Sequence, residues 1–174
     1  MSLIGYLLET PLLKLNKKDL TITVSDSTKK DLIDIGFIPE KISTLSEGLS
    51  FTPWKQEDFK KKETEPTIIY VGRFAEYKGI DASLVAFSMI KKQFPKAKMW
   101  IVGKPNMKYI EKKLNPLCSK NGLSVSFDNT PGDVEYKGFV SEEEKLSLMS
   151  RAHLLIFPSL REGWGLTISE AAAV

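Results

Sequence analysis

The sequence predicts an α/β fold, a Rossmann-like parallel sheet with helices on both faces, for three reasons. From residue 20 onward, short β-branched or apolar runs alternate with longer segments of helical periodicity. Two of the runs end at a glycine, Gly72 and Gly103, as strands commonly do before a turn. Hydrophobic residues make up 42% of the chain and charged residues 27%, the balance of a soluble globular domain. Strands that alternate with helices favour a parallel sheet that helices cover on both faces.

The first fifty residues contain a predicted strand, helix and strand, at residues 20–24, 28–35 and 41–45. Ser25, Asp26 and Ser27 supply oxygens that cap the amino end of this helix, and Gly36 suits its carboxyl end. The opening run MSLIGYLLETPLLKL has an apolar patch but neither a charged leader nor a small-residue cleavage site. We therefore expect a buried helix there rather than a signal peptide.

Residues 51–66 are polar, lysine-rich and bracketed by prolines, which predicts a linker. Beyond the linker, predicted strands at 67–71, 97–102, 125–127, 134–138 and 154–157 alternate with helices at 79–94, 107–122, 141–151 and 167–174. The first of these helices carries four apolar side chains that we place on one face: Ile80, Leu84, Phe87 and Phe94. Ser141 and Glu144 form a capping box at the start of the helix that runs to about residue 151.

The composition excludes several classes of site. Cys118 is the only cysteine and His153 the only histidine, so an internal disulfide and a His- or Cys-rich zinc site are both excluded. A serine–histidine triad would have to use His153, which lies in an apolar stretch and is expected to be structural. Lys and Arg exceed Asp and Glu by only 25 to 22, which is compatible with anionic ligands without demanding them. No run of 18 apolar residues is present to span a bilayer.

Ligands of open parallel sheets bind beyond the carboxyl ends of the strands, so the loops after residues 71, 102, 138 and 157 are the candidate sites. The first of these loops, GRFAEYKG, places Arg73 and Lys78 near the amino end of a predicted helix. Gly72 permits a sharp turn, and the helix dipole favours an anion at that end. A diphosphate would fit there. The alternative is a pair of solvated basic side chains with no ligand.

The last of these loops, PSLREGWGLTISE, carries Glu162 shortly before a predicted helix and Glu170 within it. Gly163 and Gly165 lie between the two acids and leave backbone N–H groups able to point at a ligand. A carboxylate can accept hydrogen bonds from sugar hydroxyls, and a second one can take the two hydroxyls of a ribose. The alternative is a glycine-rich turn with two surface glutamates.

PSLREGWGLTISEA resembles the signature of glycosyltransferase family 4, whose members share the two-domain GT-B fold and act with retention of configuration. GRFAEYKG is similar to the phosphate-binding loop of that family, and VEYKGFVSEEEKLSLMSRAHLLIFPS to the segment that leads into the signature. TVSDSTKKDLIDIGFIPEKISTLSEGL resembles the crossing from the first domain to the second. The resemblance covers about residues 20–174, with the motifs in the family's order.

The resemblance implies a role for each matching residue. Arg73 and Lys78 would hold the departing diphosphate, Glu162 the donor sugar and Glu170 the ribose. Four backbone amides would touch sugar and phosphate, those of Gly163, Trp164, Gly165 and Leu166. Phe139 and Val140 would lie near the base. Such enzymes use no metal or other cofactor, because cationic side chains and helix dipoles stabilise the leaving group.

The resemblance also implies a domain division: residues 1–50 end the first domain and form the crossing, 51–66 link, and 67–174 form the nucleotide-sugar-binding domain. The last predicted helix reaches Val174 without a cap, so we expect that domain, and with it the fold, to be truncated. The implied function is transfer of a hexose from a nucleoside diphosphate sugar, such as a UDP or GDP sugar, to a glycan, lipid or small acceptor. We expect a cytoplasmic location, at the inner face of the membrane if the acceptor is a lipid.

Four positions depart from the family's usual pattern. Glu47-Gly48 stands where Asn-Gly is usual, His153 where aspartate is common, Lys104-Pro105 where a second glycine pair is common, and Trp164 where phenylalanine is common.

Two alternatives to the implied function remain: another GT-B enzyme, such as an epimerase or phosphorylase, or a non-catalytic module on a Rossmann-like sheet. A dehydrogenase is not expected, since no Gly-x-Gly-x-x-Gly follows a strand, and no nucleic-acid-binding module is matched.

Overall fold

The computed structural model describes residues 11–127 and 130–174. Its backbone contacts divide the chain into two units. The first unit comprises Met1–Ser50 with Glu162–Gly165, and the second comprises Phe51–Arg161 with Leu166–Val174. No helix in the described ranges has both the length and the apolar character needed to cross a bilayer.

The first unit contains the predicted strand, helix and strand. β1 (Thr21–Thr23) pairs in parallel with β2 (Ile42–Thr44), and α2 (Asp26–Asp34) connects them. Ser25 caps α2, because its hydroxyl accepts a hydrogen bond from the backbone N–H of Thr28 at 3.2 Å. These three elements confirm the prediction.

The opening helix differs from its prediction. Residues 11–15 are helical, but their three leucines, Leu12, Leu13 and Leu15, are exposed. The expectation of a buried helix is therefore wrong for this part, since no packed face of the described chain covers the leucines. The other ten residues of the predicted helix lie outside the described ranges.

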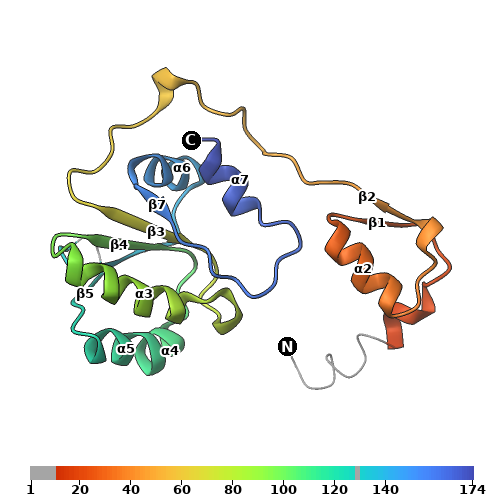
Figure 1. Ribbon diagram of the computed structural model, residues 1–174, viewed down its shortest axis with the longest axis horizontal. Helices are drawn as coiled ribbons and strands as arrows, with labels where there is room; N and C mark the ends of the chain where they lie inside the picture. Colours follow the sequence, from red (N-terminus) through yellow and green to blue (C-terminus); the bar gives the residue numbers. More distant parts are fainter. Residues whose placement is uncertain (1–10, 128–129) are drawn as a thin grey trace. The chain divides into compact units, whose positions relative to one another are not determined.

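The second unit is built on a parallel sheet of five strands in the order β5-β6-β4-β3-β7 (Figure 1). The strands are β3 (Thr67–Val71), β4 (Lys98–Val102), β5 (Val125–Phe127), β6 (Val134–Gly138) and β7 (Leu154–Leu155). β3 and β4 pair residue for residue from Thr67 with Lys98 to Val71 with Val102. β3 and most of β4 are buried, as expected for strands covered on both faces. The predicted fold class is confirmed.

Helices cover both faces of this sheet (Figure 1). One face carries α3 (Ile80–Gln93), α4 (Met107–Tyr109), the π-helical turn η4 (Ile110–Leu114) and α5 (Asn115–Lys120). The other face carries α6 (Glu142–Arg151) and α7 (Leu166–Ala172). Ser141 caps α6 by accepting from the backbone N–H of Glu144 at 3.2 Å, which confirms the cap; among the described residues, the reciprocal bond of the predicted capping box, from the Ser141 N–H to the Glu144 side chain, is absent.

Residues 107–122 do not form one regular helix, contrary to the prediction. The chain widens at η4, where the N–H of Asn115 bonds the carbonyl of Ile110, five residues back. Pro116 follows at the start of α5. Proline has no N–H to donate and crowds the carbonyl four residues before it, so the helical ladder cannot continue unchanged through this point.

Two apolar clusters hold the second unit together, one on each face of the sheet. Ile80, Leu84 and Phe87 are fully buried, which confirms the predicted face of α3. Phe94 is 53% exposed, and its placement on that face is wrong. Phe94 follows the last helical residue and has φ −123° and ψ 80°, so its side chain no longer keeps the helical direction.

β7 covers only Leu154–Leu155, less than the predicted strand at 154–157, and it is an edge strand of the sheet that the described residues form. His153 precedes it, donates its backbone N–H to the carbonyl of Thr67 at 2.8 Å, and accepts at Nδ1 from the N–H of Thr67 at 3.1 Å. These bonds agree with the structural role expected for His153.

The predicted linker, residues 51–66, contains one short 3-10 turn, η2 (Gln56–Asp58). It runs across α6 and α7, and the N–H of Trp54 donates to the carbonyl of Ala173, just past α7, at 2.9 Å.

Candidate functional site

The strand order creates a topological switch point beside β3. The chain leaves β3 for β4 on one side of it and later returns to β7 on the other side. β3 and β7 are neighbouring strands, so the loops that follow them both begin at the carboxyl edge of the sheet, and they lead to α3 and α7 on its opposite faces. Ligands of open α/β sheets bind in such crevices.

The loop after β3 gathers both predicted cations around one aromatic ring. This loop contains the 3-10 turn η3 (Glu76–Lys78), and α3 begins directly after it. The guanidinium carbon of Arg73 lies 5.9 Å from the centroid of the Tyr77 ring, and Lys78 Nζ lies 5.4 Å from it. Lys78 Nζ also lies 5.8 Å from the ring of Phe157, just beyond β7. Positive charge from the β3 loop thus lies next to the start of the β7 loop.

Close backbone packing fixes the position of this loop. Gly79 has φ +70°, and a Cβ atom there would lie 2.4 Å from the carbonyl oxygen of Pro158 in the β7 loop. The N–H of Leu160 donates to the carbonyl of Tyr77 at 2.9 Å, which adds a second link between the two loops. Tyr70 donates its hydroxyl to the carbonyl of Arg73 at 3.1 Å. Arg73 and Lys78 therefore stand on a loop that both its own strand and its neighbour hold in place.

Glu170 lies on α7 and is buried, unlike the surface glutamate of the alternative interpretation. Its Oε1 accepts a hydrogen bond from Lys145 Nζ on α6 at 2.9 Å. Lys145 also donates to Glu142 Oε2 at 2.7 Å. Burial by itself opposes the charged form of Lys145, but the hydrogen bonds from its ammonium to Glu142 and Glu170 prevail and raise its pKa above the ordinary value.

The other predicted site residues fall into two groups. Glu162, Gly163, Trp164 and Gly165 group by backbone contacts with the first unit, whereas Arg73, Lys78 and Glu170 lie in the second. The second unit also holds four more: Gly72 directly after β3, Leu166 at the start of α7, and the pair Phe139 and Val140 after β6. Phe139 is 80% exposed, while Val140 packs against the apolar cluster beneath α6.

Sequence reasoning missed a cavity of about 440 Å³ at the carboxyl ends of β4 and β6. Its walls are mostly apolar and include Phe74, Pro105, Met107, Phe127, Tyr136 and Gly138. Phe127 and Tyr136 stack with ring centroids 4.8 Å apart, and Phe74 lies 5.8 Å from Tyr136. The loops after residues 102 and 138 were expected to matter, but residues so far apart in the sequence gave no signal that their aromatic rings share one cavity.

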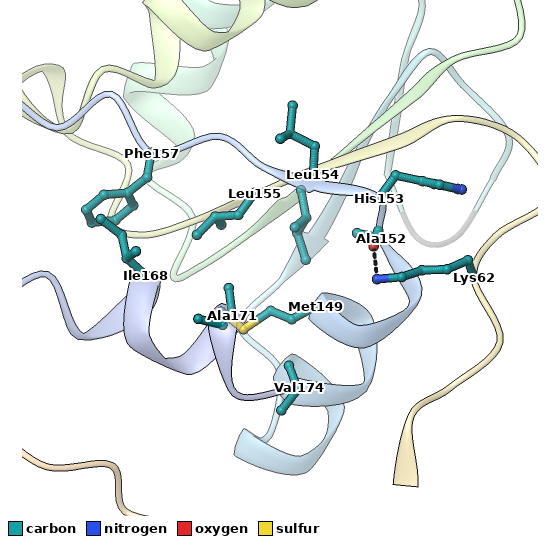
Figure 2. Close-up of a pocket in the computed structure, with 12 residues that line it drawn as sticks. Lys62, Met149, Ala152, His153, Leu154, Leu155, Phe157, Ile168, Ala171 and Val174 are labelled. Atoms are coloured by element: carbon teal, nitrogen blue, oxygen red, sulfur yellow. Dashed lines mark hydrogen bonds between the residues drawn. The ribbon is translucent and has the colours of Figure 1, made fainter. Parts of the chain in front are cut away.

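A second cavity, of about 490 Å³, lies between β7 and the helices α6 and α7 (Figure 2). Figure 2 shows that apolar side chains line it, among them Leu154, Leu155, Met149 and Ile168. The Lys62 ammonium lies at its edge and donates to the carbonyl of Ala152 at 2.6 Å. Its lining thus brings one cation to an apolar wall, whereas the β3 loop brings Arg73 and Lys78 together directly before a helix.

Two curated proteins resemble most of this chain. An uncharacterized glycosyltransferase of Methanocaldococcus jannaschii is 28% identical over 167 residues, which cover 87% of this chain and 39% of that protein. The gpi3 subunit of phosphatidylinositol N-acetylglucosaminyltransferase from Schizosaccharomyces pombe is 26% identical over 172 residues, which cover 97% of this chain and 36% of that protein. The chain therefore spans well under half the length of these relatives.

Solved structures share the fold at low sequence identity. WaaG, a glycosyltransferase involved in lipopolysaccharide biosynthesis, matches with a TM-score of 0.69 at 20% identity, covering 87% of this chain and 41% of WaaG. The pneumococcal O-GlcNAc transferase GtfA, solved with UDP and GlcNAc, matches with a TM-score of 0.69 at 18% identity, covering 95% of this chain and 30% of GtfA. Residues 52–174, the greater part of the chain, match the family described as glycosyl transferases group 1. The chain belongs to this family of glycosyltransferases, and its parallel sheet is the Rossmann-like sheet of a GT-B-type domain.

Proposed function

We propose that this chain is the donor-binding portion of a retaining glycosyltransferase of family 4 that transfers a hexose from a nucleoside diphosphate sugar to a glycan, lipid or small acceptor. One observation carries the proposal: Arg73 and Lys78 converge on Tyr77 at the switch point of the sheet, directly before the amino end of α3. Two cations and the positive end of a helix dipole at one place suit a diphosphate. Residues 1–50 would belong to the end of the first domain and the crossing, residues 51–66 to the linker, and residues 67–174 to the donor-binding domain.

The chemistry follows from placing the diphosphate there. As the bond between the anomeric carbon and the phosphate oxygen breaks, negative charge grows on the leaving diphosphate. Arg73 and Lys78 stabilise that charge without a metal ion. The acceptor oxygen attacks from the same face, and its proton passes to the departing phosphate oxygen, so configuration is retained.

The acids bind the sugars on either side of the diphosphate. Glu162 accepts from hydroxyls of the donor hexose, with backbone amides of Gly163–Gly165 and Leu166 against sugar and phosphate. Glu170 accepts from the ribose hydroxyls. Phe139 and Val140 lie near the base. A lipid acceptor would place the enzyme at the inner face of the membrane, in contact with it peripherally.

The direct test of this proposal is calorimetric titration of the 174-residue chain with UDP, GDP and ADP. We expect saturable binding of one of them that requires the diphosphate, and a loss of about ten- to a hundredfold in affinity for Arg73→Ala, because a hydrogen bond to a charged group is removed. Lys96→Ala is the matched control, since Lys96 is an exposed cation next to the amino end of β4. Equal affinity of both variants for the diphosphate would refute the phosphate site.

A second test separates the two acids. Glu170→Ala is expected to weaken nucleoside binding, whereas Glu162→Ala mainly slows transfer in the full-length enzyme, and Glu143→Ala on the exposed side of α6 serves as control. The 174-residue chain alone is expected to transfer no sugar, because the acceptor site belongs to the preceding domain. A non-catalytic module, the alternative, would bind nucleotide without transfer even at full length.

A further inference from the structure

Lys145 is a largely enclosed cation whose inner partner is Glu170, the residue expected to bind the ribose. It belongs to α6, four residues after the cap Ser141, and its side chain is 14% exposed. Its ammonium lies 2.9 Å from Glu170 Oε1 on α7 and 2.7 Å from Glu142 Oε2. Glu170 is itself 8% exposed, whereas Glu142 is 75% exposed and lies on the solvent side of Lys145. The proposed function assigns no role to Lys145.

The inner pair differs in physical character from the outer one. A buried carboxylate requires a charged or hydrogen-bonded partner, and Lys145 supplies both to Glu170. The two residues come from different helices that pack on each other, so the ion pair also sets the position of the Glu170 side chain relative to α6. The pair with Glu142 has a carboxylate that is 75% exposed, so solvent screens it more than the inner pair with Glu170.

The hydrogen bonds leave part of the Glu170 carboxylate available. Lys145 occupies Oε1, and within the described ranges no hydrogen bond reaches Oε2. A carboxylate has about four acceptor positions, so one ammonium leaves room for two hydroxyl donors. A vicinal diol is the donor pair that fits such an acceptor held in one orientation.

We infer that Lys145 is a positioning residue for nucleotide recognition: its ion pair fixes the Glu170 carboxylate so that the remaining acceptor positions take the ribose diol of a nucleoside diphosphate. This inference rests on the proposed function, because it requires Glu170 to bind ribose. It goes further by assigning the preference for ribose over deoxyribose to a residue on a different helix. Without Lys145, the Glu170 side chain would lose its fixed orientation, and the diol would lose its advantage over a single hydroxyl.

The test compares UDP, GDP and ADP with their 2′-deoxy counterparts by calorimetry. For the unaltered chain, we expect the ribonucleotide to bind roughly tenfold more tightly, as one hydrogen bond to a charged acceptor implies. Lys145→Met should reduce this preference to about twofold or less, and Lys145→Arg should restore most of it. Lys91→Met is the matched control, because Lys91 is 22% exposed and pairs with Asp133, which directly precedes the amino end of β6. It should keep the full preference.

A structural role alone would produce a different pattern. If Lys145→Met weakens ribo- and deoxyribonucleotides equally, the inference is overturned. If the unaltered chain binds diphosphates with no preference for ribose, the inference also fails, while the phosphate site at Arg73 stands. No saturable binding of any diphosphate would overturn the proposed function together with this inference. Should Lys145→Met lower the melting temperature strongly, Lys145→Gln, which keeps a donor without a charge, takes its place. Lys145→Gln, Glu170→Gln and the double variant then form a double-mutant cycle, and additive effects on the preference for ribose would overturn the inference.

Discussion

Replacing Gly79 by alanine tests whether the β3 loop is held by its contact with the β7 loop. Gly79 has φ +70°, a conformation that costs a residue with a side chain about 1–2 kcal/mol. The new Cβ atom would also lie 2.4 Å from the carbonyl oxygen of Pro158 and 2.9 Å from its ring carbon Cγ. Carbon and oxygen do not approach so closely without repulsion, so one of the two loops must move.

Gly122→Ala provides the matched control. Gly122 has φ +67°, almost the same backbone conformation, but no atom lies within 4 Å of the position that a Cβ atom would take there. It should lose only the conformational term of about 1–2 kcal/mol. Gly79→Ala should lose this amount and a further contribution of about 1–3 kcal/mol, typical of an overpacked site. At about 2–4 °C per kcal/mol for a chain of this size, Gly79→Ala should melt about 2–12 °C below Gly122→Ala.

The assay is urea and thermal unfolding followed by tryptophan fluorescence, in which buried Trp100 reports on the second unit. Diphosphate titration of the same variants follows, because a displaced loop carries Lys78 with it. We expect Gly79→Ala to bind UDP, GDP or ADP less tightly than Gly122→Ala does. Equal stability losses in the two variants would show that the contact with Pro158 does not constrain the loop, and the reasoning about the switch point would then fail.

Three further predictions concern the core and its edges. Burial raises the pKa of the Cys118 thiol to about 11, so iodoacetamide at pH 8 should label it only after urea unfolds the chain. Leu84→Ala should destabilise the protein by about 2–5 kcal/mol in urea unfolding, whereas Phe94→Ala, at an exposed position, should cost far less. Burial opposes the charged form of Asp133, but hydrogen bonds from Lys91 and Ser124 prevail and lower its pKa. The stabilising contribution of Asp133 is therefore fully present above its unfolded pKa of about 3.9. It is lost as the pH falls through the lower pKa of the folded state. The gap in melting temperature between the protein and Asp133→Asn should therefore shrink from pH 6 to pH 3.

Local patterns in the sequence were sufficient for most elements of the second unit. β3 begins and ends where its apolar run does, and α6 begins after its predicted cap, Ser141. That Ile80, Leu84 and Phe87 share one face of α3 was also predictable, because the helical repeat of 3.6 residues depends only on the backbone. Period, caps and turn residues act over a few neighbouring positions, so the sequence alone determined them.

The same local patterns gave wrong predictions at the end of a helix, next to a proline, and where an apolar stripe has no surface to pack against. Phe94 follows the helical period but stands one residue past the helix, and the run at 107–122 keeps its period although Pro116 interrupts the ladder. The exposed leucines near residue 12 show that an apolar stripe does not bury itself without a partner surface.

The candidate site divides in the same way. Glycines, cations and acids in loops between strands and helices are visible in the sequence, and so is their resemblance to one glycosyltransferase family. Three features depend on tertiary structure: the order of strands that puts the β3 and β7 loops side by side, the rings that surround Lys78, and the pairing of Glu170 with Lys145. Lys145 and Glu170 are 25 positions apart, and only the packing of α6 on α7 brings an ammonium to a carboxylate that neither helix could bury alone.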